Sequence, residues 1–98
     1  MAMNHKLEAQ GWEVVTVDDL LGLSPSESQM VELHLRLARA LRQQRRERDL
    51  SQALLAERMR SSQSRVAKME AADTGVSVDL YVRALLAAGC TLHEIGQI

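Results

Sequence analysis

The sequence predicts an all-α fold, a compact bundle of about five helices, and three observations support this class. Aromatic residues make up only 2% of the chain, as Trp12 and Tyr81, so the core must consist of aliphatic and Met side chains. Such a core suits interlocking helices, whereas a sheet would favour aromatic and β-branched residues. Apolar residues also recur at helical spacing between Ser, Thr and Gly borders. Finally, 98 residues with 46% apolar content suit one domain.

We expect residues 1–15 to form a partly flexible N-terminal arm and residues 16–98 to form a single domain. The first elements of that domain are a short helix from Thr16 to Gly22 and a long helix that begins at Ser24. Ser24 can cap the long helix, with Pro25 as its first residue and Glu27 completing a capping box.

We expect the long helix to end near Arg48. Its predicted core stripe is Met30, Leu33, Leu37, Ala40 and Leu41, and its arginines Arg36, Arg39, Arg42 and Arg46 cluster elsewhere on it. His34 lies near the stripe, and we expect it to pack against the core and not to bind a ligand.

Two short helices with a tight turn between them are predicted over residues 50–70. Ser51 can cap the first, whose apolar stripe is Leu54, Leu55 and Met59. The turn is Arg60-Ser61-Ser62, and the second helix begins near Gln63. Its buried side is predicted to hold Val66, Ala67 and either Met69 or Glu70.

The chain is expected to end with one further helix and a final short turn. Ser77 caps the helix over residues 78–88, and Gly89 ends it. The residues expected to face inward are Leu80 or Tyr81, Ala84, Leu85 and Ala88. Thr91 caps the last turn, which leaves an exposed apolar edge of Leu92, Ile95 and Ile98 unless that edge folds back or meets a second copy.

Charge is distributed unevenly along the chain. The net charge is −1, but residues 1–33 carry −5, residues 34–68 carry +7 and residues 69–98 carry −3. A basic segment between acidic ends is the electrostatic footprint of a nucleic-acid surface, and a solvated helix face rich in Arg is the alternative. No apolar run approaches the roughly 18 residues of a membrane span, and the first residues lack the apolar region of a signal peptide. We therefore expect a cytoplasmic protein, with the lone Cys90 reduced and buried.

The second helix of the 50–70 pair has a polar side formed by Gln63, Ser64, Arg65 and Lys68. Amide, hydroxyl, guanidinium and ammonium groups are those that bond base edges and phosphates. Two helices joined by a tight turn, with such a face on the second, are typical of a helix-turn-helix that enters the major groove of DNA. The alternative is a pair of ordinary helices with one solvated face.

A linked set of motifs is similar to the lambda-repressor and Cro (XRE) family of DNA-binding domains. The set is Arg45, Leu50-Ser51-Gln52, Leu55-Ala56, Ser62-Gln63-Ser64, Val66, Met69 and Glu70, and the similarity covers about residues 33 to 89. Two residues depart from the family pattern. Arg60 stands where the turn glycine is usual, and Asp49 stands where a glycine often precedes Leu-Ser-Gln.

The resemblance implies roles for individual residues. The base readers would be Ser62, Gln63, Ser64 and Lys68, Gln52 would contact a phosphate, and Arg45 would form a structural salt bridge with Glu70. Arg42 and Arg65 are further candidate phosphate contacts. One recognition helix reads about half a site, so we expect a homodimer on a palindromic operator of double-stranded DNA.

The expected role is transcription regulation, with repression favoured. The segment GLSPSE followed by LARALRQQRRERDLSQ is also similar to antitoxins of the HigA type. That resemblance would give residues 12–33 a role in binding a protein toxin, whereas in an ordinary repressor they would brace a dimer. A protein-interaction module that keeps the fold without binding DNA is the alternative. We expect no enzyme activity, metal or cofactor, because no nucleophile with a base, metal-ligand cluster or phosphate loop stands out.

Overall fold

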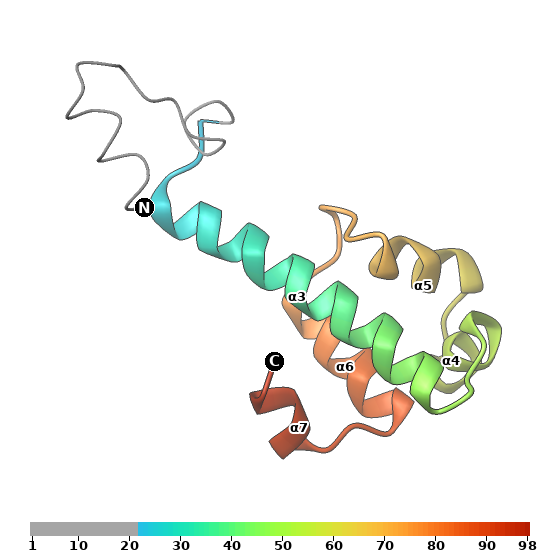
Figure 1. The fold of residues 1–98 in the computed structure, drawn as a ribbon. Helices are drawn as coiled ribbons and strands as arrows, with labels where there is room; N and C mark the ends of the chain where they lie inside the picture. The colour runs from blue at the N-terminus through green and yellow to red at the C-terminus, as the bar shows by residue number, and fades with distance from the viewer. Residues whose placement is uncertain (1–21) are drawn as a thin grey trace, which may run out of the picture. The chain divides into compact units, whose positions relative to one another are not determined.

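A computed structural model of the protein describes residues 22–98, which contain helices and no strand (Figure 1). The helices are α3 (Pro25–Glu47), α4 (Gln52–Met59), α5 (Gln63–Glu70), α6 (Val78–Ala88) and α7 (Leu92–Gly96). This confirms the all-α class. The predicted arm over residues 1–15 and the predicted start of the domain lie outside the described residues and stay predictions.

The chain divides into two compact units, residues 1–32 and residues 33–98, and α3 begins in the first and ends in the second. In the first unit Ser24 caps α3 as predicted, because its Oγ accepts a hydrogen bond of 3.2 Å from the amide of Glu27. The second unit holds the remaining helices and the buried core.

The core contribution of α3 begins later along the helix than its apolar stripe predicts. Leu37, Ala38 and Leu41 are buried, and Ala40 packs against the core. Met30 and Leu33 are exposed, so their predicted place in the core is wrong. Apolar spacing marks a face of a helix but not how much of its length other elements cover, and here the buried turns begin only at Leu37.

The two helices of the predicted pair are present as α4 and α5, and they contact each other. On α4 the buried residues are Leu55 and Ala56, while Leu54 is 40% exposed, which contradicts its predicted burial. On α5 the buried residues are Val66 and Met69. Two neighbouring leucines point about 100° apart on a helix, so only one of them can face the core fully.

The turn between α4 and α5 keeps its geometry without a glycine. Arg60 adopts the left-handed conformation with φ 55°, and its amide donates to the Glu57 carbonyl at 3.0 Å. The amide of Ser61 donates to the Ala56 carbonyl at 2.8 Å, which is the 6→1 hydrogen bond of a Schellman motif. The strain of a non-Gly residue in this conformation is about 1 kcal/mol. Asp49 and Ala72, with φ 54° and 57°, are the other non-Gly residues of this kind among those described.

Helix α6 contacts both α4 and α7, and its buried residues are Tyr81, Ala84, Leu85 and Ala88, as predicted. Gly89 ends the helix with φ 106°. The hydroxyl of Tyr81 donates to the Met69 carbonyl at 2.7 Å, so it ties α6 to the end of α5. His34 lies edge-on to the Tyr81 ring, with centroids 6.0 Å apart, and its Nε2 donates to the Val76 carbonyl at 2.8 Å. The expected packing role of His34 is thus confirmed.

Helix α7 has a complete capping box between Thr91 and Glu94. Ile95 and Ile98 pack against the core, so the apolar edge folds back at these two residues, one of the alternatives that the sequence left open, whereas Leu92 is 77% exposed. Cys90 is buried as predicted, and burial raises the pKa of its thiol. Arg48, which follows α3, connects the end of that helix to the α6–α7 region through contacts of 3.4 Å with the Gly89 carbonyl and with Glu94.

Candidate nucleic-acid interface

Helix α5 presents its polar side to solvent. Gln63, Ser64, Arg65 and Lys68 are all exposed, whereas Val66 and Met69 on the opposite side are fully buried. Ser62 caps the helix, because its Oγ accepts from the amide of Arg65 at 3.2 Å, and its hydroxyl lies 3.2 Å from that of Ser64. The structure therefore places the four predicted base-reading residues on one helix and its cap, with Ser62, Gln63 and Ser64 at its start and Lys68 in its last turn.

The other end of α5 is fixed by a partly buried ion pair between Arg45 and Glu70. Arg45 donates from Nε to Glu70 Oε2 at 2.6 Å and from Nη2 to Oε1 at 2.9 Å, a bidentate geometry. The two side chains are 11% and 6% exposed. Arg45 also donates from Nη1 to the Leu50 carbonyl at 2.8 Å, so one guanidinium joins α3, the α3–α4 turn and α5.

Electrostatics at this pair favour the charged forms. Burial alone would raise the pKa of the Glu70 carboxyl, but hydrogen bonds from Arg45 and Gln52 and the charges of Arg45 and Arg42 outweigh it and lower that pKa. The hydrogen bond to Glu70 raises the pKa of Arg45 in spite of its burial. The pair is therefore ionised throughout the neutral range.

Gln52, predicted as a phosphate contact, lies at the first position of α4 and donates from Nε2 to Glu70 Oε1 at 3.3 Å. This contact was not foreseen from the sequence. The motif Leu-Ser-Gln predicted that Gln52 lies at the start of a helix, but no local sequence pattern indicates a hydrogen-bond partner 18 residues away. Gln52 thus forms part of the support of α5 as well as part of the exposed surface beside it.

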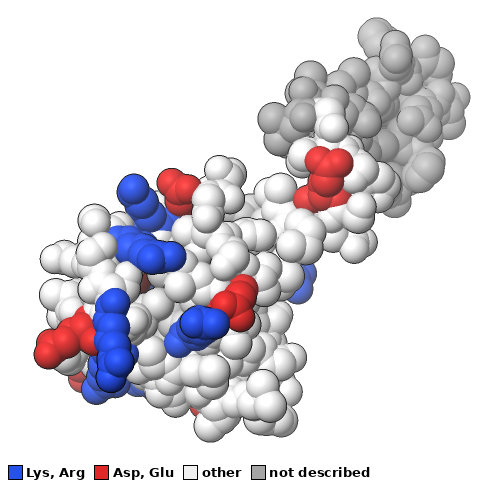
Figure 2. All heavy atoms as spheres, turned by 180° about the vertical axis from the view of Figure 1, so that it is seen from behind, with Lys and Arg blue, Asp and Glu red and all other residues white. Residues whose placement is uncertain are grey.

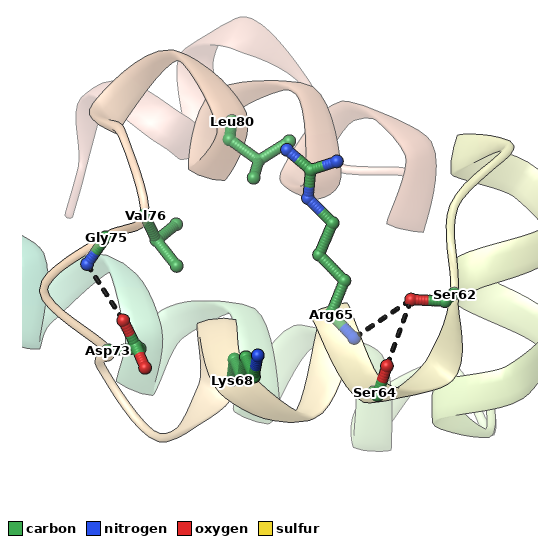
Figure 3. Close-up of a pocket in the computed structure, with 8 residues that line it drawn as sticks. All are labelled: Ser62, Ser64, Arg65, Lys68, Asp73, Gly75, Val76 and Leu80. Atoms are coloured by element: carbon green, nitrogen blue, oxygen red, sulfur yellow. Dashed lines mark hydrogen bonds between the residues drawn. The ribbon is translucent and has the colours of Figure 1, made fainter.

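A hollow of about 370 Å³ lies on one flank of α5, between that helix and the loop that leads into α6 (Figure 3). It is lined by Ser62, Ser64, Arg65, Lys68, Asp73, Gly75, Val76 and Leu80. In Figure 3 the Arg65 side chain extends from α5 toward Leu80 of α6. Asp73 Oδ1 accepts from the amide of Gly75 at 2.8 Å, so its carboxylate is partly occupied in holding the loop.

A second hollow, of about 230 Å³, lies on the other flank of α5, where that helix meets α3 and the start of α4. It is lined by Arg42, Arg45, Arg46, Gln52, Ala67, Glu70 and Ala71. The predicted phosphate contacts Arg42 and Gln52 are thus brought together here. Arg46, which the sequence placed only in a cluster of arginines, joins them.

The two hollows lie on opposite sides of the exposed face of α5. At 100° per residue, Ser64, Arg65 and Lys68 point to one side of that face, whereas Ala67 and Glu70 point to the other. Arg65, the third predicted phosphate contact, is therefore separated from Arg42 and Gln52 by the width of the helix. The exposed face has a cationic flank on each side.

Basic side chains are concentrated in this half of the unit. Figure 2 shows Lys and Arg on the side of the molecule that carries α4 and α5, with a few acidic side chains among them. Exposed cations on these helices and their turn include Arg58, Arg60, Arg65 and Lys68. The later part of the basic segment thus forms a surface at α4 and α5, whereas Arg36 and Arg39 line a separate hollow beside α7.

Residues 22–98 contain no group of three or more His, Cys, Asp and Glu side chains placed to hold a metal ion. Over the same residues, no helix has the length and apolar character needed to span a membrane.

A comparison with known protein families identifies the domain that carries this site. The family model described as a helix-turn-helix domain matches residues 36–96, which include the α4–α5 pair, most of the buried core and both hollows. Searches of curated proteins and of solved structures gave no match. Since the model covers more than half of the 98 residues, the chain belongs to the helix-turn-helix domain family, whose members are typical DNA-binding regulators.

Proposed function

We propose that the protein is a sequence-specific, DNA-binding transcriptional repressor of the XRE type. The observation that carries this proposal is the exposed polar face of α5 with a cationic hollow on each flank. The major groove is bounded by two phosphate backbones and admits one helix between them. A helix with polar base-reading groups on its exposed face and cations on both flanks is complementary to that groove.

Base reading is assigned to the N-terminal half of α5. Gln63 and Ser64 lie in its first turn, the part of a recognition helix that approaches base edges most closely. An amide can bond adenine in two places, which contributes roughly 1–3 kcal/mol of discrimination. Lys68, one turn further along, and Ser62, at the cap, complete the proposed set.

Phosphate contacts are assigned to both flanks. Arg42, Gln52 and Arg46 line one hollow, and Arg65 lines the other. Glu70 also lines the first hollow, but its carboxylate is bound by Arg45 and Gln52, so its charge is largely compensated. Phosphate contacts fix the orientation of a protein on the duplex, and they leave the choice of sequence to the bases.

We further propose that the protein acts as a homodimer. One unit presents one recognition helix, which spans about half of a typical operator, and two copies would place their α5 helices about one DNA turn apart. A toxin-binding role for residues 12–33, as in HigA-type antitoxins, is an extension of this proposal. Residues 12–21 of that segment lie outside the described residues, so the extension rests on the sequence resemblance.

The experiment is a binding titration of the purified chain against DNA immediately upstream of its own coding region, with a shuffled duplex as the control, at two salt concentrations. Tight binding to the upstream DNA that weakens steeply with salt supports a repressor of its own transcription. Equal affinity for both duplexes removes the proposed base reading. No binding to either would favour the alternative function, a protein-interaction module that retains the fold.

A further inference from the structure

Arg60 has an unfavourable backbone conformation. No contact of its side chain within residues 22–98 explains why an arginine occupies this position. Its φ of 55° lies in the region that glycine occupies without strain. Its amide supplies the bonds that end α4, and a glycine amide would supply the same bonds. The conformation therefore gives no reason for a long charged side chain at this position.

The Arg60 side chain is exposed, and within residues 22–98 its guanidinium makes no hydrogen bond or ion pair. The two other non-Gly residues with positive φ differ in this respect. Asp49 is of a residue type that tolerates this conformation, and Ala72 packs its methyl group against the core. Arg60 thus combines strain with an unused cation.

The position of Arg60 gives that cation a use. It lies in the turn two residues before Ser62, the cap of α5, and three before Gln63, the first residue of the proposed recognition helix. Glu57, one turn back on α4, is the nearest acid along the chain, whereas Arg58 and Arg65 add to the positive charge around the turn. A guanidinium here lies close along the chain to the end of α5 that is proposed to approach the bases.

We propose that Arg60 is a positioning residue that binds a DNA phosphate beside the bases contacted by the start of α5. The inference rests on the proposed DNA binding and adds a contact from the turn itself to those on the two flanks. Residues that are strained in the free protein and act only on binding are found at ligand sites, where folding stability is lower than it could be.

The test compares Arg60→Gly with three other variants in the full chain. Arg60→Lys keeps the charge and the strain. Asp49→Gly relieves the same backbone conformation at the other exposed turn. Arg83→Ala removes one positive charge from an exposed site on α6, where Arg83 pairs with Asp79 at 2.8 Å. Affinity for the upstream duplex and for a shuffled duplex is measured at several salt concentrations, together with Tm.

We expect Arg60→Gly to melt at the same or a higher temperature than the wild type and to bind both duplexes about fivefold more weakly at 0.15 M salt, with the salt slope reduced by about 0.9. Arg60→Lys should keep most of the affinity and slope, because a phosphate accepts either cation. Asp49→Gly should not weaken binding, and Arg83→Ala should leave both slope and affinity near wild type.

Each other outcome overturns the inference. Wild-type affinity and slope in Arg60→Gly would remove the contact and leave the proposed function intact. A fall in affinity that accompanies a fall in Tm would make Arg60 a structural residue of the turn. A loss confined to the upstream duplex with an unchanged slope would mean a base contact instead. Failure of the wild-type chain itself to bind DNA would overturn the proposed function, and this inference with it.

Discussion

The two ends of α5 are built in opposite ways. At the C-terminal end, Met69 is fully buried, its carbonyl accepts from Tyr81, and Glu70 is held by Arg45 in a bidentate pair. At the N-terminal end, Gln63 and Ser64 are exposed, and the Ser62 cap holds the first turn of the helix. One end joins the helix to the core, and the other leaves its side chains available for a ligand.

From this difference we expect stability and the proposed DNA recognition to depend on separate residues within the eight positions of one helix. Substitutions at the buried end should unfold the unit, and substitutions at the exposed end should change DNA binding in a protein that still folds.

Glu70→Ala should have the largest effect. It leaves the partly buried Arg45 guanidinium without its partner, which costs about 3 kcal/mol of folding free energy. At about 4–8 °C per kcal/mol for a domain of this size, Tm should fall by roughly 10–25 °C. Calorimetry or circular dichroism measures the change, and Glu57→Ala, an exposed acid on α4, is the control with an expected change within about 0.5 kcal/mol.

The double variant Arg45→Met/Glu70→Leu distinguishes the stability supplied by the ion pair from the cost of leaving one charge unpaired. Replacing both partners by apolar side chains is often close to neutral, because neither charge then stays buried and unpaired. If the double variant is as unstable as Glu70→Ala, the pair itself, and not the orphaned guanidinium, supplies the stability.

The same pair predicts a loss of stability in acid. The pKa of Glu70 in the folded protein lies below its ordinary value of 4.5, so its ionised form stabilises the fold above about pH 4.5. That contribution should decline as the pH falls from 4.5 through the lowered pKa. Tm measured from pH 7 to pH 3 should therefore converge for the wild type and Glu70→Gln at the acid end. A constant difference between the two would contradict the link.

The buried end of α5 was the easier one to predict from the sequence. The spacing of Val66 and Met69 placed the core side, and the family resemblance paired Arg45 with Glu70, which the structure shows in contact. The sequence did not indicate that Gln52 also bonds Glu70, because that contact depends on how α4 crosses α5. Spacing along a helix gives a direction for each side chain but not its neighbours from other helices.

The errors have a common physical origin. Leu54, Met30 and Leu33 belong to regular apolar patterns, yet they are exposed, because a pattern does not show how much of a helix its neighbours cover. For Ile95 and Ile98 the sequence left open whether their edge is exposed or folds back, and they pack on the core because the short α7 lies against α6. The flanking hollows of the candidate site could not be predicted either. One is formed where residues 42–46, 52 and 67–71 meet, and the other depends on how α6 and its preceding loop pack beside α5.

Gln63→Ala tests the exposed end. Loss of the amide should reduce discrimination between the operator and shuffled DNA by roughly 1–3 kcal/mol, while non-specific binding stays near wild type. Because the Gln63 side chain is exposed, the free energy of unfolding should change by less than about 0.5 kcal/mol. Competition binding with both duplexes measures the first quantity, and urea unfolding measures the second. A variant that loses affinity for both duplexes equally would show that Gln63 does not read bases.

Arg42→Ala should have the smallest effect, and it separates the flank from the face of α5. If Arg42 binds one phosphate, the slope of log affinity against log salt should fall in magnitude by about 0.9, equally for operator and shuffled DNA. Between 50 and 200 mM salt, the variant should then lose about threefold less affinity than the wild type. Arg42 also contributes to the lowered pKa of Glu70, so the free energy of unfolding must be measured together with the DNA titration. A changed slope with unchanged stability would assign Arg42 to the DNA, whereas an unchanged slope with reduced stability would assign it to the support of Glu70.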